Sequence, residues 1–71
     1  MQLPIDDRIL ECLSESELVL SPAVIAFNID KSRDEVNRRL SELTDKGYVD
    51  RVKRGYYRID QDGEEYLSGE S

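Results

Sequence analysis

The chain has 71 residues, 10 basic and 16 acidic, so its formal net charge at pH 7 is −6. A chain of this length makes one small domain, 1–71, with a thin core, because it buries only about 60% of the surface of its unfolded state. It has no histidine, one cysteine and no glycine-rich phosphate loop, which excludes the usual zinc sites, histidine-based catalysis and a disulfide framework, so we expect no enzyme, cofactor or metal.

The first predicted element is a helix that begins at Pro4 and covers residues 5–13, since proline suits the first turn of a helix. Apolar residues recur there at the spacing of one helical face, at Ile5, Ile9, Cys12 and Leu13. On this face Cys12 is expected to be a small buried residue rather than a reactive thiol. Residues 18–20, Leu-Val-Leu, are long enough for a minimal strand.

Two further helices are predicted, separated by a short turn. Ser21 and Pro22 cap and open the second helix, which should end near residues 28–30, with asparagine in the left-handed conformation. Ser32 and Glu35 form a capping box at the start of the third helix, residues 32–46. Its buried stripe is expected at Val36, Leu40 and Leu43.

A β-hairpin should follow, with strands at 48–52 and 56–59 around a turn that contains Gly55. Val49 and Val52 fall on opposite faces of the first strand, and we expect a bulge or a strong twist, at a position the pattern does not give, to reconcile them. Tyr48 and Tyr57 are expected to join the core.

A short last helix is predicted from Asp62 or Gly63, and residues 68–71 should fray. The resulting order is helix, short strand, helix, helix, hairpin and short helix. This is an α+β, mostly α architecture, a winged helix-turn-helix with a three-helix core, a β-hairpin wing and a short C-terminal helix.

The charge is distributed unevenly along the chain. Residues 31–58 hold nine of the ten bases and five acids, a local charge of +4, whereas residues 1–30 and 59–71 carry −5 each. A run of charges is often only a solvated surface. This chain, however, uses acids on its flanks, so the basic segment predicts binding to double-stranded DNA.

The third helix is the one that enters the major groove in a helix-turn-helix. With its apolar stripe inward, the residues available to read bases are Arg33, Asp34, Asn37, Arg38 and Ser41. Asp34 can instead hold Arg38 one turn away. Contacts to the DNA backbone, or from the wing to phosphates or the minor groove, are predicted for Lys31, Arg39, Arg51, Lys53, Arg54, Tyr56 and Arg58.

An alternative is that the winged helix serves protein–protein contact without reading DNA, because the acidic flanks would repel phosphates. We expect no small-molecule ligand. No segment is long and apolar enough to cross a membrane and no signal-peptide pattern is seen, which together with the single cysteine predicts a soluble cytoplasmic protein. A homodimer through the first and last helices is a further expectation, although the core can also use their apolar residues, Leu3, Ile5, Tyr66 and Leu67.

Four segments carry a family resemblance: Ser21-Pro22-Ala23-Val24-Ile25-Ala26, Ser32-Arg33-x-x-Val36-x-Arg38-Arg39-Leu40-x-x-Leu43, Gly47-Tyr48-Val49-x-Arg51, and Gly55-Tyr56-Tyr57-Arg58-Ile59-x-x-x-Gly63-x-x-Tyr66-Leu67. They resemble archaeal winged-helix transcription regulators, in particular small repressor-like proteins of halophilic archaea and their viruses, similar to the phage phi-H repressor. The resemblance implies sequence-specific DNA binding, usually as a dimer, to regulate promoters. It also implies acidic flanks suited to concentrated salt. Asp60 departs from the threonine often found there, which leaves the cap of the last helix open.

Overall fold

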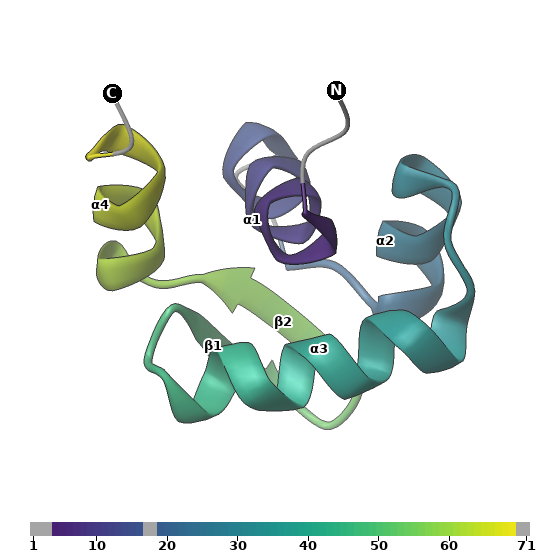
Figure 1. Ribbon diagram of the computed structural model, residues 1–71. Coiled ribbons are helices and arrows are strands. Elements are labelled where there is room, and N and C mark those ends of the chain that lie inside the picture. Colours follow the sequence, from purple (N-terminus) through teal and green to yellow (C-terminus); the bar gives the residue numbers. More distant parts are fainter. Residues whose placement is uncertain (1–3, 17–18, 70–71) are drawn as a thin grey trace.

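A computed structural model of the chain describes residues 4–16 and 19–69. Its elements are α1 (Ile5–Ser16), α2 (Pro22–Ile29), α3 (Arg33–Asp45), β1 (Val49–Lys53), β2 (Tyr56–Ile59) and α4 (Gln61–Ser68). In Figure 1, α3 and the loop that joins β1 to β2 lie on the lower side, and α1 and α4 lie on the upper side. Within these residues, four helices and a two-stranded antiparallel hairpin confirm the predicted winged helix-turn-helix.

The core lies where α1, α2, α3 and β1 meet, and α1 also contacts α4. In the described chain its buried apolar residues are Ile9, Leu10, Leu13, Ile25, Ala26, Ile29, Val36, Leu40, Leu43 and Val49. The predicted stripe of α3 is therefore confirmed. In α1 the prediction missed Leu10, whereas Cys12 is only half-buried at the margin of the core.

Side-chain caps define the helix-turn-helix. The Ser21 hydroxyl accepts a hydrogen bond from the Val24 N–H at 3.4 Å, and the Ser32 hydroxyl accepts one from the Glu35 N–H at 3.2 Å, which satisfies N–H groups that the first turns leave open. α2 ends at Ile29, and its C-cap residue Asp30 has a left-handed φ of 61°. The predicted end of α2 is thus right, but aspartate rather than asparagine takes the left-handed conformation.

The hairpin contains the bulge that the sequence could not place. Arg51 pairs with Tyr57 and Lys53 pairs with Tyr56, so the register shifts at Val52. Val52 remains 46% exposed, which means that the bulge does not turn it into the core. The first strand begins one residue later than predicted, at Val49.

Only part of the predicted strand at residues 18–20 lies in the described chain. There, Leu20 forms an isolated antiparallel bridge with Tyr57: the Leu20 N–H donates to the Tyr57 carbonyl at 2.8 Å, and the Leu20 carbonyl accepts a hydrogen bond from the Tyr57 N–H at 2.9 Å. This bridge ties the α1–α2 connection to β2, but it is not a full strand.

The last helix starts earlier than predicted, at Gln61, because the Asp60 carboxylate accepts a hydrogen bond from the Gln61 N–H at 2.8 Å and caps it. The helix ends at Ser68 with Gly69 as its cap, and residues 70–71 lie outside the described chain. Tyr66 stacks on Tyr48, with 5.2 Å between ring centroids, and donates its hydroxyl to Asp7 at 2.9 Å. These contacts hold α4 against α1 and the core.

The apolar residues at both ends of the domain serve this core. Ile5, Tyr66 and Leu67 are partly buried and pack against it, as do Tyr48 and Tyr57. The two tyrosines therefore join the core as predicted, although they lie at its margin. Leu3, the other residue of the expected dimer surface, lies outside the described residues.

Candidate nucleic-acid interface

The outer face of α3 is open to solvent along its length. Its buried stripe points toward α1 and α2, and all five residues predicted to read bases are exposed: Arg33, Asp34, Asn37, Arg38 and Ser41. Because the Ser32 cap fixes where the helix starts, these side chains come from its first three turns. That is the part of a recognition helix that meets base edges in the major groove.

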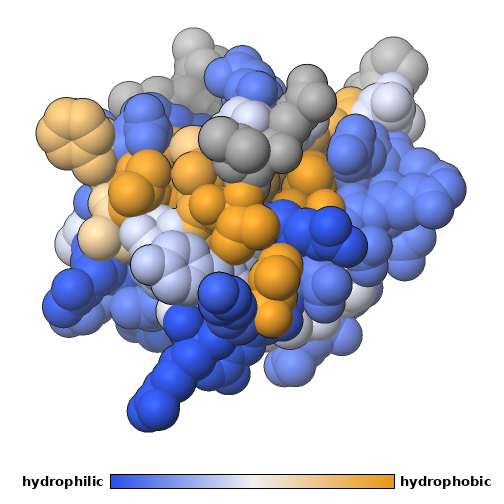
Figure 2. All heavy atoms as spheres, turned by 180° about the vertical axis from the view of Figure 1, so that it is seen from behind, coloured by the Kyte–Doolittle hydropathy of each residue, from blue (hydrophilic) through white to orange (hydrophobic). Residues whose placement is uncertain are grey.

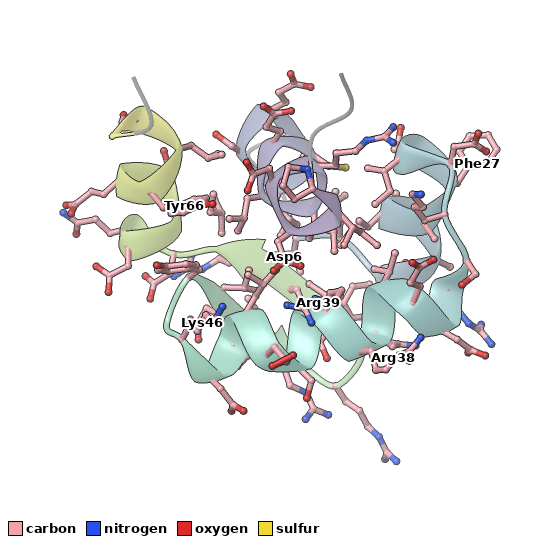
Figure 3. The ribbon with its side chains drawn as sticks, in the orientation of Figure 1. Asp6, Phe27, Arg38, Arg39, Lys46 and Tyr66 are labelled. Atoms are coloured by element: carbon pink, nitrogen blue, oxygen red, sulfur yellow. The ribbon has the colours of Figure 1, made fainter. Side chains whose placement is uncertain are left out.

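The adjacent arginines Arg38 and Arg39 have different surroundings. Arg39 points toward α1, where its Nε lies 2.7 Å from Asp6 Oδ1 and its Nη2 lies 2.8 Å from Asp6 Oδ2 (Figure 3). Its Nη1 also pairs with Glu42 Oε2 at 2.7 Å. The hydrogen bonds and the charge of Asp6 raise the pKa of Arg39 above its ordinary range.

These ion pairs occupy Arg39, which was predicted to contact phosphate. Arg38 and its neighbours Arg33 and Asn37 differ from Arg39 in this respect. In the part of the chain that the structure describes, their side chains form no hydrogen bond or ion pair. The one-turn pair of Asp34 and Arg38, expected as one alternative, is likewise not formed among the described residues. Arg38 is thus free to meet an external partner.

The hairpin places a second set of cations on the surface. Arg51, Lys53, Arg54 and Arg58 are exposed, and Tyr56 is 46% exposed. Arg58 stands opposite Asp50 across the hairpin, with 4.0 Å between its Nε and Asp50 Oδ2, so its charge is partly compensated. Lys31, in the turn before α3, is also exposed.

Most exposed acids of the two flanks lie away from the basic segment. They are on α1 and α4, among them Glu11, Glu64 and Glu65, whereas Asp30 follows α2. These helices occupy the side of the molecule opposite the lower edge that is formed by α3 and the hairpin loop (Figure 1). A phosphate backbone that approaches α3 and the hairpin loop therefore meets the basic segment first.

Asp6 is the residue that sequence reasoning missed. It holds Arg39 on the shoulder of α3 that faces α1, 33 residues away in sequence. Asp6 also lies in the first turn of α1, where a carboxylate interacts favourably with the helix dipole. A pair between elements so distant leaves no local sequence signal.

Cys12 stands outside this interface. It lines an open groove between α1 and α2 together with Arg8, Glu11 and Asn28. Burial raises the pKa of the Cys12 thiol, and the nearby Glu15 carboxylate raises it further. The thiol is therefore protonated at neutral pH, as expected for a structural cysteine.

Two other kinds of site do not arise in the described part of the chain. Residues 4–16 and 19–69 bring together no three acidic or thiol side chains able to hold a metal ion. None of the helices in these segments is long and apolar enough to cross a membrane.

Comparison with known proteins extends this description. No curated protein and no solved structure gives a significant match. Among protein families, residues 1–71 match the one described as winged helix-turn-helix phage repressor. With its whole length matched and its fold in agreement, the chain belongs to the winged helix-turn-helix phage repressor family.

Proposed function

We propose that the protein is a transcription regulator, and specifically a repressor, that binds double-stranded DNA in a sequence-specific manner. In this proposal the N-terminal half of α3 lies in the major groove, and the hairpin is the wing. The free outward side chains of Arg33, Asn37 and Arg38 carry the proposal. Arginine can pair with guanine O6 and N7, and asparagine with adenine N6 and N7.

The wing supplies the contacts that do not depend on sequence. Lys53 and Arg54 precede Gly55 at its tip, where they can reach phosphates or the minor groove, and Tyr56 can donate its hydroxyl to a phosphate. Family membership supports DNA binding and regulation, since the family comprises DNA-binding regulators rather than enzymes. The resemblance to haloarchaeal repressors adds the expectation that two copies act together.

High salt is a further element of the proposal. The acidic flanks of −5 each support a protein that stays hydrated in concentrated salt, as in salt-accumulating archaea. At about 1 M salt the Debye length is about 3 Å, so repulsion between these flanks and DNA becomes local. Phosphate contacts also weaken with salt, which leaves the base contacts of α3 to sustain binding.

The proposal is tested by selecting bound DNA from a random pool at low and at high KCl. We expect enrichment of one short consensus, and its loss in the triple variant Arg33→Ala, Asn37→Ala, Arg38→Ala. All three side chains are exposed, so circular dichroism should show this variant to be folded. Failure to enrich any sequence would overturn the proposal. Protein capture that persists after nuclease treatment would then favour the protein–protein alternative.

A further inference from the structure

Two acids hold Arg39, although this arginine belongs to the helix that we propose lies in the major groove. Arg39 donates to both carboxylate oxygens of Asp6, at 2.7 and 2.8 Å, and to Glu42 Oε2 at 2.7 Å. We call these three side chains the Arg39 cluster. Two carboxylates and one guanidinium give the cluster a formal net charge of −1. Arg39 therefore adds no net positive charge to the surface of α3.

The Arg39 cluster lies where a DNA backbone would pass. A helix with its side chains is about 10–12 Å across and the major groove is about 12 Å wide, so both shoulders of a helix in that groove lie near phosphates. Arg39 is on the shoulder of α3 that faces α1 (Figure 3). Its side chain is 31% exposed and that of Glu42 is 57% exposed. Released from Asp6, Arg39 would be placed to contact a phosphate.

Other cations of the proposed interface are left free. In the part of the chain that the structure describes, no ion pair engages Arg33, Arg38, Lys53 or Arg54. Seen from behind, hydrophilic side chains occupy the lower part of the molecule, and apolar side chains gather in a band above them (Figure 2). Contact with DNA on the lower side therefore depends on charge and hydrogen bonds. The Arg39 cluster withholds one cation from a surface that otherwise presents its cations to solvent.

We propose that Asp6, assisted by Glu42, competes with DNA phosphates for Arg39 and so lowers the affinity for DNA of any sequence. A phosphate gains Arg39 only when Arg39 gives up its two parallel bonds to Asp6, which fix the guanidinium in direction as well as distance. Asp6 acts only through Arg39, so it is a positioning residue rather than a DNA contact.

The inference rests on the proposed function and adds to it how binding to other sequences is limited. Phosphate contacts supply nearly all of the affinity for DNA without the recognised sequence. A genome offers a vast excess of such DNA, which competes with the regulated site for the protein. A withheld phosphate contact shortens the time spent on these competing sequences, and leaves binding more dependent on the bases that α3 meets.

Titration of a short duplex of random sequence, followed by fluorescence anisotropy from about 0.1 to about 0.4 M KCl, tests the inference. Asp6→Asn should bind this duplex roughly three- to tenfold more tightly at about 0.1 M KCl. Its slope of log K against log salt concentration should be steeper by about 0.9, the value for one added phosphate contact. Adding Arg39→Gln to Asp6→Asn should abolish both changes. A pair with only a structural role would not raise DNA affinity when it is removed.

Asp7→Asn is the matched control. It removes the same charge from the next position of α1, where the carboxylate accepts the Tyr66 hydroxyl instead of an arginine. A general loss of negative charge would strengthen DNA binding equally in the two variants. We expect Asp7→Asn to leave the salt slope unchanged. Glu42→Gln breaks one of the three bonds of Arg39 and should raise the affinity less than Asp6→Asn does, because the Asp6 pair remains.

The inference is overturned if Asp6→Asn gains no more affinity than Asp7→Asn, or if its gain persists after Arg39→Gln is added. Circular dichroism should show each variant folded at the assay temperature. Should Asp6→Asn unfold, an unchanged affinity of Glu42→Gln for the random duplex would overturn the inference instead. Selection of a DNA consensus by the wild type decides the proposed function separately. A wild type that selects a consensus, with an Asp6→Asn variant of unchanged affinity for the random duplex, loses only this inference.

Discussion

Arg39 on α3 and Asp6 on α1 form a two-pronged ion pair, with one guanidinium nitrogen on each carboxylate oxygen at 2.7 and 2.8 Å. The two side chains are 31% and 23% exposed. Two parallel bonds fix the direction of the guanidinium as well as its distance. The pair therefore adds a contact of fixed geometry between α3 and α1 to the packing of the buried stripe of α3.

Removing the carboxylate charge of this pair should destabilise the fold. We expect Asp6→Asn to lower the melting temperature measured by circular dichroism by a few degrees, and Arg39→Lys to lower it less, because lysine keeps the charge but not the paired geometry. Glu11→Gln, on an exposed position of α1, is the control and should leave the melting temperature unchanged. Equal melting temperatures for all four proteins would contradict a structural role for the pair.

Arg38 should behave as a base-reading residue. Arg38→Ala is expected to cost about 1–3 kcal/mol of binding free energy on the selected DNA site and to relax specificity at one base pair. Lys46→Ala removes the same charge at the C-terminal end of α3 and should weaken binding slightly on all sequences. Mobility-shift titrations at matched salt measure both. Unchanged specific binding by Arg38→Ala would show that the base contacts are assigned wrongly.

The wing should act through phosphate charge. The double variant Lys53→Ala, Arg54→Ala is expected to weaken binding evenly across sequences and to reduce the slope of log K against log salt concentration by about 1 for each lost phosphate contact. Arg8→Ala removes a positive charge from α1 and should leave this slope unchanged. A loss of affinity that is confined to the selected DNA sequence would instead indicate that the wing reads bases.

Local signals were enough to predict α3. Ser32 three residues before Glu35 marks its start, and the spacing of Val36 and Leu40 gives its buried side. The role of Arg39 could not be predicted in the same way. Counting at 100° per residue places it on a shoulder of the helix, and only the fold shows that Asp6 lies beside that shoulder.

Other differences between the predictions from sequence and the structure also have physical causes. The predicted start of α4 is too late because the Asp60 carboxylate caps the helix directly at Gln61. The bulge at Val52 depends on cross-strand register, which the sequence of one strand does not contain. The open side of α2 was also unpredictable. The apolar pattern shows that Phe27 is hydrophobic, but not that α2 has a neighbour on one side only.

Salt should stabilise the fold if the high-salt proposal is right. The flanks at residues 1–30 and 59–71 each carry −5, and screening reduces the repulsion among these acids. Circular dichroism should find the domain more completely folded at about 2 M than at about 0.05 M KCl. The double variant Asp62→Asn, Glu64→Gln should reduce the difference in folding between the two salt concentrations. Equal folding and solubility of the wild type at both salt concentrations would remove the support for the proposal.

Gly63 on α4 is the position where a single methyl group should disturb the domain most directly. It is buried, and a Cβ added there would lie 2.8 Å from Ile59 Cγ1 and closer still to the backbone carbonyl oxygen of Tyr48. That carbonyl accepts the Asp60 N–H at 2.9 Å, so it is not free to move away. The close approach of α4 to the start of the hairpin therefore depends on glycine.

Gly63→Ala should consequently destabilise the protein by about 1–3 kcal/mol in urea titrations, as overpacking of a tight site does. The sign of the change in the free energy of unfolding is diagnostic, because alanine in place of glycine at a solvent-exposed position inside a helix stabilises the helix by about 0.8–1.0 kcal/mol. Ser68→Ala, on an exposed position of the same helix, is the control and should change stability by less than about 0.5 kcal/mol. Near-UV circular dichroism should also weaken as α4 moves and separates Tyr66 from Tyr48. A Gly63→Ala protein more stable than the wild type would mean that α4 does not pack against the Tyr48 carbonyl in solution.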